Sequence, residues 1–213
     1  MSWERMTRPK RVGGIGFKDM NFFNQALLAK QGWRLLQNPS SLCARVLKSK
    51  YYPNGELLDT VFAADASPAW RGIEFGLELL KEGVVWRIGD GRSVRIQRDN
   101  WIPRRSGLKA ASFTRNCRLR WVNQLIKADT NEWDVELIRQ ICPTYDADEI
   151  CKIRLPTKKI KDCIAWNHEN SGVFSVRSAY KLAEEIKSRN TPIASSSSCQ
   201  ANNRSIWDLV WKG

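Results

Sequence analysis

The sequence has one histidine, relatively few acidic residues and no long apolar run. No stretch approaches the ~20 consecutive apolar residues that a membrane-spanning helix requires. The segment from Met1 to Met6 also lacks the apolar centre of a signal peptide. We therefore expect a chain that is neither secreted nor membrane-bound, located in the nucleus or the cytoplasm. Without an export signal, the six cysteines are expected to remain reduced thiols.

Basic residues and tryptophan are what the sequence has in excess. Lysine and arginine number 35 against 22 acidic residues, which gives a formal net charge of +13. Such a surface attracts polyanions, of which nucleic acid is the commonest and an anionic membrane surface the second. Ten tryptophans suit stacking on bases, although tryptophan is also an ordinary large core residue. The hydrophobic content of 42% is typical of a folded globular chain.

The spacing of apolar residues predicts three helices in the first third of the chain. They cover residues 19–38, 41–50 and 67–83, and the short connection between the first two makes them a helical hairpin. Asp19 is a favourable N-cap, and Ser67 followed by proline opens the third helix. The second helix is expected to bury Leu42, Val46 and Leu47.

An alternation of apolar and polar residues predicts a β-hairpin over residues 84–97. Its strands are 84–88 and 92–97, and the Gly-Asp-Gly sequence between them is a favourable turn. One face of this hairpin would pack on the protein. The other face would present arginines to solvent.

The second half of the chain predicts further short helices and strands. Helices are expected from about residue 130 and over 146–155, and the last one over 178–187. Strands at 164–166 and 173–176 are expected to form a second hairpin. The predicted fold class is therefore α+β, with helices first, then a basic β-hairpin, then a second small α+β unit.

Several ordered motifs resemble plant non-LTR (LINE-type) retrotransposon reverse transcriptase polyproteins. The longest read PKRVGGIGFKDM over residues 9–20 and FNQALLAKQGWRL over 23–35. Further matches follow in the same order, among them WRIGDG at 86–91 and GVFSVRSAY at 172–180. The resemblance covers nearly the whole chain. It places the chain after the polymerase core and running into the start of the reverse-transcriptase zinc-binding domain.

The resemblance implies a non-catalytic piece of a longer polyprotein. The family's polymerase holds two metal ions with a Tyr-x-Asp-Asp-type motif, and no two aspartates are adjacent in this sequence. Two-metal phosphoryl transfer needs clustered carboxylates, so we expect no polymerase activity. The resemblance also implies that the ribonuclease H domain and the zinc-binding residues lie downstream of Gly213. We interpret the chain as a truncated reading frame.

Together these patterns predict five segments. They are a basic, Gly-rich N-terminal segment (1–18), the helical region with the β-hairpin as a post-polymerase connector (19–103), a basic loop with a small α+β unit (104–187), a flexible Ser/Asn-rich linker (188–205) and the truncated start of the zinc-binding domain (206–213).

One basic stretch supplies most of the candidate nucleic-acid-binding residues. Between residues 98 and 120 the only acid is Asp99, and aromatic residues are interleaved with the arginines. The arginines would neutralise phosphates. Trp101 is a candidate for base stacking, although a tryptophan at a strand end is more often part of the core. The predicted interface consists of Arg87, Arg92, Arg95, Arg98, Trp101, Arg104, Arg105, Arg115, Arg118 and Arg120.

No catalytic, metal or cofactor site is predicted. No pair of cysteines has the spacing of a zinc module. No oxyanion motif accompanies Cys163 and His168, and His168 is interpreted as a solvated turn residue. Asp99 is expected to form a structural ion pair with the neighbouring Arg98.

Two functions of different classes remain open from the sequence. The first is a connector that contacts template RNA or target DNA through phosphates, without sequence specificity. The second is a structural scaffold between the polymerase core and the zinc-binding domain, or a relic without function. RNA-directed DNA polymerase activity would belong only to an intact parent.

Overall fold

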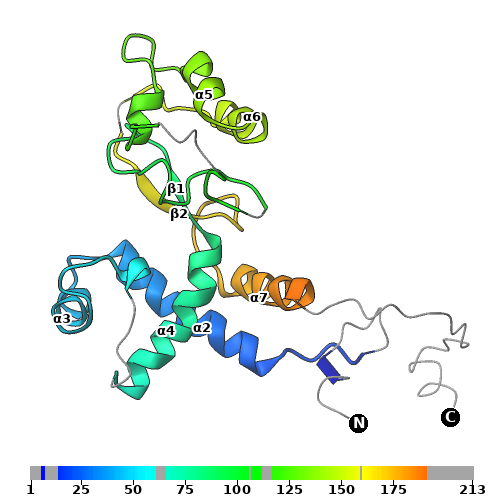
Figure 1. Ribbon diagram of the computed structural model, residues 1–213. Helices are drawn as coiled ribbons and strands as arrows, with labels where there is room; N and C mark the ends of the chain where they lie inside the picture. Colours follow the sequence, from blue (N-terminus) through cyan, green and yellow to red (C-terminus); the bar gives the residue numbers. More distant parts are fainter. Residues whose placement is uncertain are drawn as a thin grey trace, which may run out of the picture.

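The computed structural model describes residues 6–7, 14–60, 66–105, 107–111, 117–158 and 160–190. Figure 1 shows two parts, a helical part and a loop-rich part that carries α5 and α6, with β1 and β2 where they meet. Each part has its own hydrophobic core. The α+β class predicted from the sequence is confirmed. The expected segment 206–213, nearly all of the expected linker and Arg115 lie outside the described residues.

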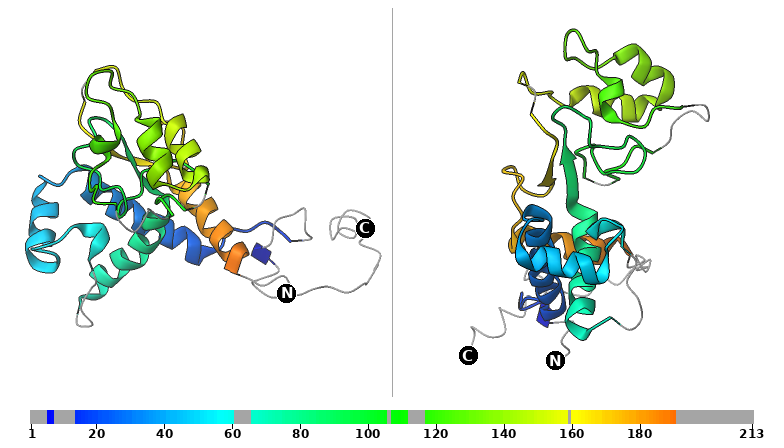
Figure 2. Two further views of the ribbon diagram at one scale, coloured as in Figure 1. Left: turned by 45° about the horizontal axis from the view of Figure 1, so that its top comes forward. Right: turned by 90° about the vertical axis from the view of Figure 1, so that its left-hand side faces the viewer.

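Three helices build the core of the helical part. α2 (Met20–Gln37) crosses α4 (Pro68–Gly83), and α7 (Val176–Asn190) packs against both, as the two views of Figure 2 also show. Gly76 lets α2 and α4 approach closely, because a Cβ there would collide with the backbone of Ala29. Among the described residues no helix is long and apolar enough to cross a membrane.

Local signals start the first helices where the sequence predicts them. The side chains of Asp19, Ser41 and Ser67 accept backbone N–H groups from the first turns of α2, α3 (Leu42–Tyr51) and α4. Each bond satisfies one of the N–H groups that a helix start leaves without an internal partner.

The face that α3 buries differs from the prediction. Leu42 and Val46 are 76% and 55% exposed, whereas Ala44 is buried. Ala44 is followed at helical spacing by Leu47 and Tyr51, which pack against the same core. Tyr51 selects this stripe, because its ring stacks on the buried Trp70 with centroids 4.3 Å apart. The short helix η2 (Leu57–Asp59) follows, with Leu57 buried.

The two strands are far apart in the sequence. β1 (Val84–Arg87) continues directly from α4 and pairs antiparallel with β2 (Cys163–Trp166). This pairing corrects both predicted hairpins. Residues 92–97 do not pair with β1, and residues 173–175 form no strand, because α7 begins at Val176.

The turn predicted within the first hairpin wraps around a carboxylate instead. The backbone N–H groups of Gly89 and Gly91 donate to Oδ1 of Asp162 at 2.7 and 2.9 Å, and Ser93 N donates to Oδ2 at 2.9 Å. A Cβ on Gly89 would collide with the backbone of Ile160. The residues just before β2 therefore occupy the place where a hairpin would have folded back.

The second core lies in the loop-rich part. Its helical elements are η3 (Val122–Leu125), α5 (Val135–Ile141) and α6 (Thr144–Lys152). α5 starts later than predicted, because Asp134 caps it by accepting the N–H of Leu137.

The second core also includes the loop between β1 and η3. Ile102 and Ala110 are both buried in it, so the boundary expected between residues 103 and 104 falls inside one hydrophobic cluster. α7, by contrast, returns to the helical core, where Ala179 and Leu182 are buried.

Candidate nucleic-acid interface

Residues 94–96 and 120–122 form a short antiparallel contact that orients part of the predicted interface. Arg95 lies opposite Trp121, and a backbone hydrogen bond of 3.0 Å flanks this pair on each side. Successive side chains on extended backbone point to opposite faces. Arg95 and Trp121 therefore face outward, while the inward side chains of Val94, Ile96 and Val122 are fully buried.

The outward side chains line a half-open groove of about 400 Å³, called the arginine groove below. The Trp121 ring lies next to a cation of this groove, since the Arg95 guanidinium is over that ring, 5.8 Å from its centroid. Three of the lining residues are arginines and none is acidic. The lining residues are Arg95, Gln97, Arg98, Leu119, Arg120 and Trp121.

Backbone hydrogen bonds to two side chains hold the walls of the arginine groove. The Asp99 carboxylate accepts from Arg95 N at 2.6 Å, and Gln124 Oε1 accepts from Arg120 N and Trp121 N at 2.8 and 3.0 Å. This corrects the expectation that Asp99 pairs with Arg98. The described partner of Arg98 is Asp59, at 2.5 Å.

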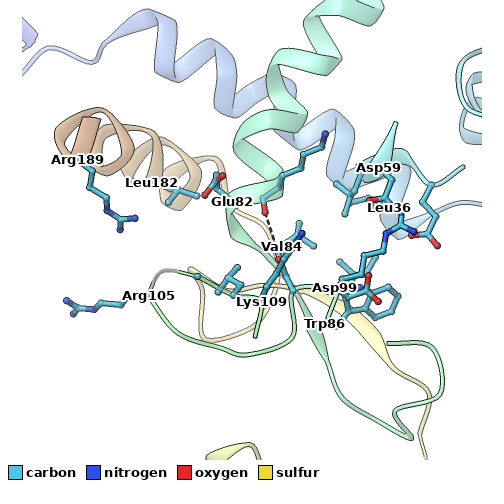
Figure 3. Close-up of a pocket in the computed structure, with 18 residues that line it drawn as sticks. Leu36, Asp59, Glu82, Val84, Trp86, Asp99, Arg105, Lys109, Leu182 and Arg189 are labelled. Atoms are coloured by element: carbon cyan, nitrogen blue, oxygen red, sulfur yellow. Dashed lines mark hydrogen bonds and ion pairs between the residues drawn. The ribbon is translucent and has the colours of Figure 1, made fainter. Parts of the chain in front are cut away.

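Arg98 also borders a second cavity, of about 410 Å³, between the two parts of the molecule (Figure 3). Arg105 and Lys109 line it on one side and Asp59 on another. Its five cationic residues are largely offset by four acidic ones, so its attraction for a polyanion is weaker than that of the arginine groove. The four acids are Glu56, Asp59, Glu82 and Asp99.

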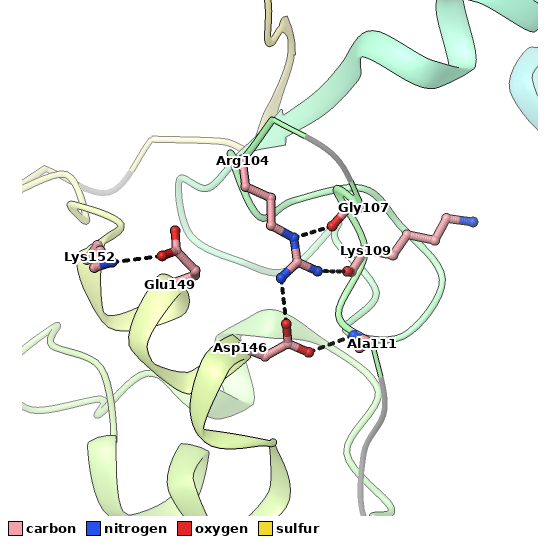
Figure 4. A network of polar contacts seen from close by, with 7 residues as sticks. All are labelled: Arg104, Gly107, Lys109, Ala111, Asp146, Glu149 and Lys152. Carbon is pink, nitrogen blue, oxygen red and sulfur yellow. Dashed lines mark hydrogen bonds and ion pairs between the residues drawn. The ribbon is translucent and has the colours of Figure 1, made fainter. Parts of the chain in front are cut away.

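Arg104 is a structural residue and not a free phosphate ligand, which corrects its predicted role. Its guanidinium donates to Asp146 Oδ1 at 2.6 Å and to the carbonyl oxygens of Gly107 and Lys109 (Figure 4). Asp146 is fully buried and also accepts from Ala111 N at 2.6 Å. All three guanidinium nitrogens of Arg104 are thus used within the protein.

Trp101 is also corrected, because it is fully buried in the second core. Its indole N–H donates to the carbonyl oxygen of Ile96 at 2.9 Å, and its ring has no exposed face on which a base could stack. Trp121, by contrast, is exposed and lines the arginine groove, although it was not among the predicted site residues. No local signal could have found this exposure, because the alternation from Arg118 to Arg120 would place Trp121 inward, on the side of Leu119.

The remaining predicted arginines do not gather at the arginine groove. Arg87, Arg92 and Arg118 are exposed, and Arg87 lies close to Gly172, where a Cβ would be 3.0 Å from its guanidinium. Arg105 lines the second cavity. Of the ten predicted residues, the structure brings together Arg95, Arg98 and Arg120.

Burial shifts the pKa values of Cys142 and His168, which lie outside the arginine groove. Burial raises the pKa of the Cys142 thiol to about 12, and the charge of the nearby Asp146 adds to this. Burial also lowers the pKa of His168 below its usual value, whose ring lies 5.4 Å from that of Trp166. His168 is thus half-buried rather than solvated as predicted. Within the described ranges, no three His, Cys, Asp or Glu side chains are grouped so that they could hold a metal ion.

Comparison with known proteins identifies relatives in Arabidopsis thaliana. An uncharacterized mitochondrial protein is 40% identical over 103 residues, which cover 48% of this chain and 67% of that protein. A protein named "Putative ribonuclease H protein" is 30% identical over 223 residues, which cover 100% of this chain and 33% of that protein. No family model and no solved structure matches the chain.

The chain thus spans about two thirds of the first relative and one third of the second. The similarity to the second runs along the whole chain and therefore includes both hydrophobic cores and the arginine groove. From the identity and coverage of the first relative, the chain belongs to the same plant protein family as the uncharacterized mitochondrial protein of Arabidopsis thaliana.

Proposed function

We propose that the chain is a non-catalytic, retrotransposon-derived segment that binds nucleic acid through its phosphates. The observation that carries this proposal is the arginine groove, which gathers Arg95, Arg98 and Arg120 without an acidic residue in its lining. The net charge of +13 adds a long-range attraction for the same kind of partner. Phosphate contacts of this kind release counterions and need no particular base sequence.

The origin of the segment is part of the proposal. Its ordered motifs resemble plant LINE-type reverse transcriptase polyproteins, and a relative over its whole length is named as a ribonuclease H protein. Both descriptions fit a parent polyprotein that acts on nucleic acid. We place the segment between the polymerase core and the zinc-binding domain of such a parent, where it would hold template RNA or target DNA.

A scaffold role is the second candidate, and one observation favours it. Leu42 and Val46 on α3 are exposed although both are apolar, which suits a contact with another part of a parent polyprotein. A scaffold of this kind would not need the arginine groove. A measurement of nucleic-acid binding therefore distinguishes the scaffold role from the nucleic-acid-binding role.

The test is a salt titration of binding to labelled single-stranded RNA and duplex DNA, followed by fluorescence anisotropy. The logarithm of the binding constant should fall linearly with the logarithm of salt concentration, by about 0.9 per phosphate contact on duplex and about 0.7 on single strands. The double variant R95Q/R120Q should flatten that slope by up to two contacts. No binding at low salt would reject the proposal and leave the scaffold.

The matched control is the double variant R45Q/R154Q, which removes two exposed arginines outside the lining of the arginine groove. It lowers the net charge by the same amount. The control should keep the wild-type slope. Equal losses in both double variants would mean that binding follows overall charge and that the arginine groove is not the site.

A further inference from the structure

We infer that the arginine groove takes single-stranded nucleic acid and stacks one unpaired base on Trp121. This inference rests on the proposed function, because it names the form of nucleic acid that the same site prefers. Its starting point is the position of Trp121, which the phosphate contacts alone do not explain.

Trp121 is the most exposed tryptophan among the residues that the structure describes. It is 36% exposed, whereas Trp70, Trp101 and Trp166 are at most 1% exposed. The buried tryptophans fill the two hydrophobic cores. In the register of the 120–122 contact, Trp121 takes the outward position and the smaller Val122 the buried one, since neighbouring side chains point to opposite faces.

The Trp121 ring is also placed beside cations. The Arg95 guanidinium lies 5.8 Å from the ring centroid, and Arg98 and Arg120 line the same groove. An aromatic ring next to arginines offers a stacking surface for a base and counter-charges for the phosphates on either side of it. A phosphate-only site needs the arginines but has no use for an exposed indole.

The form of the groove favours an unpaired base. In a duplex, each base is covered above and below by its neighbours, so its flat face is not available to a protein ring. A base in a single strand can turn out and stack. The volume of about 400 Å³ lies in the range of small-molecule sites, which suits a single turned-out nucleotide better than the broad surface of a duplex.

The experiment compares three probes of equal length with the full chain: a single-stranded oligonucleotide, the same strand without its bases, and a duplex. The variant is Trp121→Leu, and Trp121→Phe keeps an aromatic ring. Trp121→Leu should weaken binding of the base-bearing strand about 5- to 150-fold, the range expected for loss of one stacked base. Binding of the abasic strand and of the duplex should change less than about twofold, and Trp121→Phe should restore most of the affinity.

The outcomes separate the inference from the proposed function. Equal effects of Trp121→Leu on all three probes, or no effect on any, would overturn base stacking while phosphate binding remains. If the wild-type chain binds none of the probes, the proposed function itself fails. Matching circular dichroism spectra and melting temperatures of the three proteins would exclude a folding defect as the cause.

Discussion

The guanidinium of Arg104 and the carboxylate of Asp146 lie 2.6 Å apart at the edge of the second core, and Asp146 has no exposed surface. Removing one partner of a buried pair leaves the other without a counter-charge. We therefore expect Arg104→Met to lower the free energy of unfolding by about 3–5 kcal/mol. Urea denaturation followed by circular dichroism measures this loss.

The control for this prediction is the neighbouring pair of Lys152 and Glu149, at 2.7 Å, in which the Lys152 side chain is 68% exposed. Exposed ion pairs contribute little because water screens them. Lys152→Ala should leave the urea midpoint unchanged. If Arg104→Met shifted the midpoint no further than Lys152→Ala, the structural role assigned to Arg104 would be wrong.

Asp162 should be essential for the loop that precedes the arginine groove. Its carboxylate accepts N–H groups from Gly89, Gly91 and Ser93. Asp162→Ala leaves the buried N–H groups of Gly89 and Gly91 without their acceptor, and each unsatisfied buried group costs about 1–3 kcal/mol. We expect a lower urea midpoint and faster amide hydrogen exchange at Gly89 and Gly91.

Asp90 provides the comparison for that experiment. It lies in the same loop, but its carboxylate makes a local contact, accepting the N–H of Arg92 at 3.2 Å. Asp90→Ala should therefore be close to wild type in stability and exchange. Similar losses in the Asp90 and Asp162 variants would contradict the assigned role of Asp162.

His168 should make the protein less stable in mild acid. Burial lowers its pKa in the folded state, so the unfolded chain, with a pKa near 6.5, takes up the proton first. The free energy of unfolding should fall as pH decreases below about 6.5. Since the chain has one histidine, its imidazole signal in proton NMR reports the folded pKa without a substitution. A folded value above 6.5 would contradict this prediction.

Cys142 should be protected from alkylation in the folded protein. It is buried, and its pKa is raised to about 12, so almost no reactive thiolate forms at pH 8. Cys43 and Cys163 are exposed and should react with iodoacetamide in the native state. Peptide mass spectrometry before and after unfolding in urea measures the difference. Modification of Cys142 at the rate of Cys43 without denaturant would refute its burial.

Features that depend on neighbouring residues could be predicted from the sequence. The caps Asp19, Ser41 and Ser67 each act within three residues of their own position, so their side chains identify the helix starts directly. The fold class follows from the same local patterns. The burial of α3 could not be predicted in this way, because the stacking of Tyr51 on Trp70 decides which stripe faces the core.

The strand pairing depended on distant residues. Residues 84–97 have the alternation and the Gly-Asp-Gly turn of a hairpin, but the turn binds Asp162, which follows 71 positions after Gly91. A single aspartate gives no sequence signal that it will bind a particular loop. This long-range contact, and not local propensity, makes β2 the partner of β1.

The sequence indicated the region of the candidate site but could not indicate which of its residues lie together. The predicted interface does contain Arg95, Arg98 and Arg120. Charge alone could not distinguish these from Arg104, which is paired with a buried carboxylate. Nor could composition distinguish Trp101 from Trp121, because Trp101 is buried in the second core whereas Trp121 lies opposite Arg95 on an outward face.

The pairing of β1 with β2 has a consequence for synthesis on the ribosome. α2, α4 and β1 emerge early, but α7, which covers α2 and α4, is not translated until after β2. The second core, by contrast, comes from one continuous stretch between Ile88 and Ile150. The middle of the nascent chain can therefore fold first, while the earlier helices keep the apolar surface that α7 covers exposed until residue 190 has left the exit tunnel.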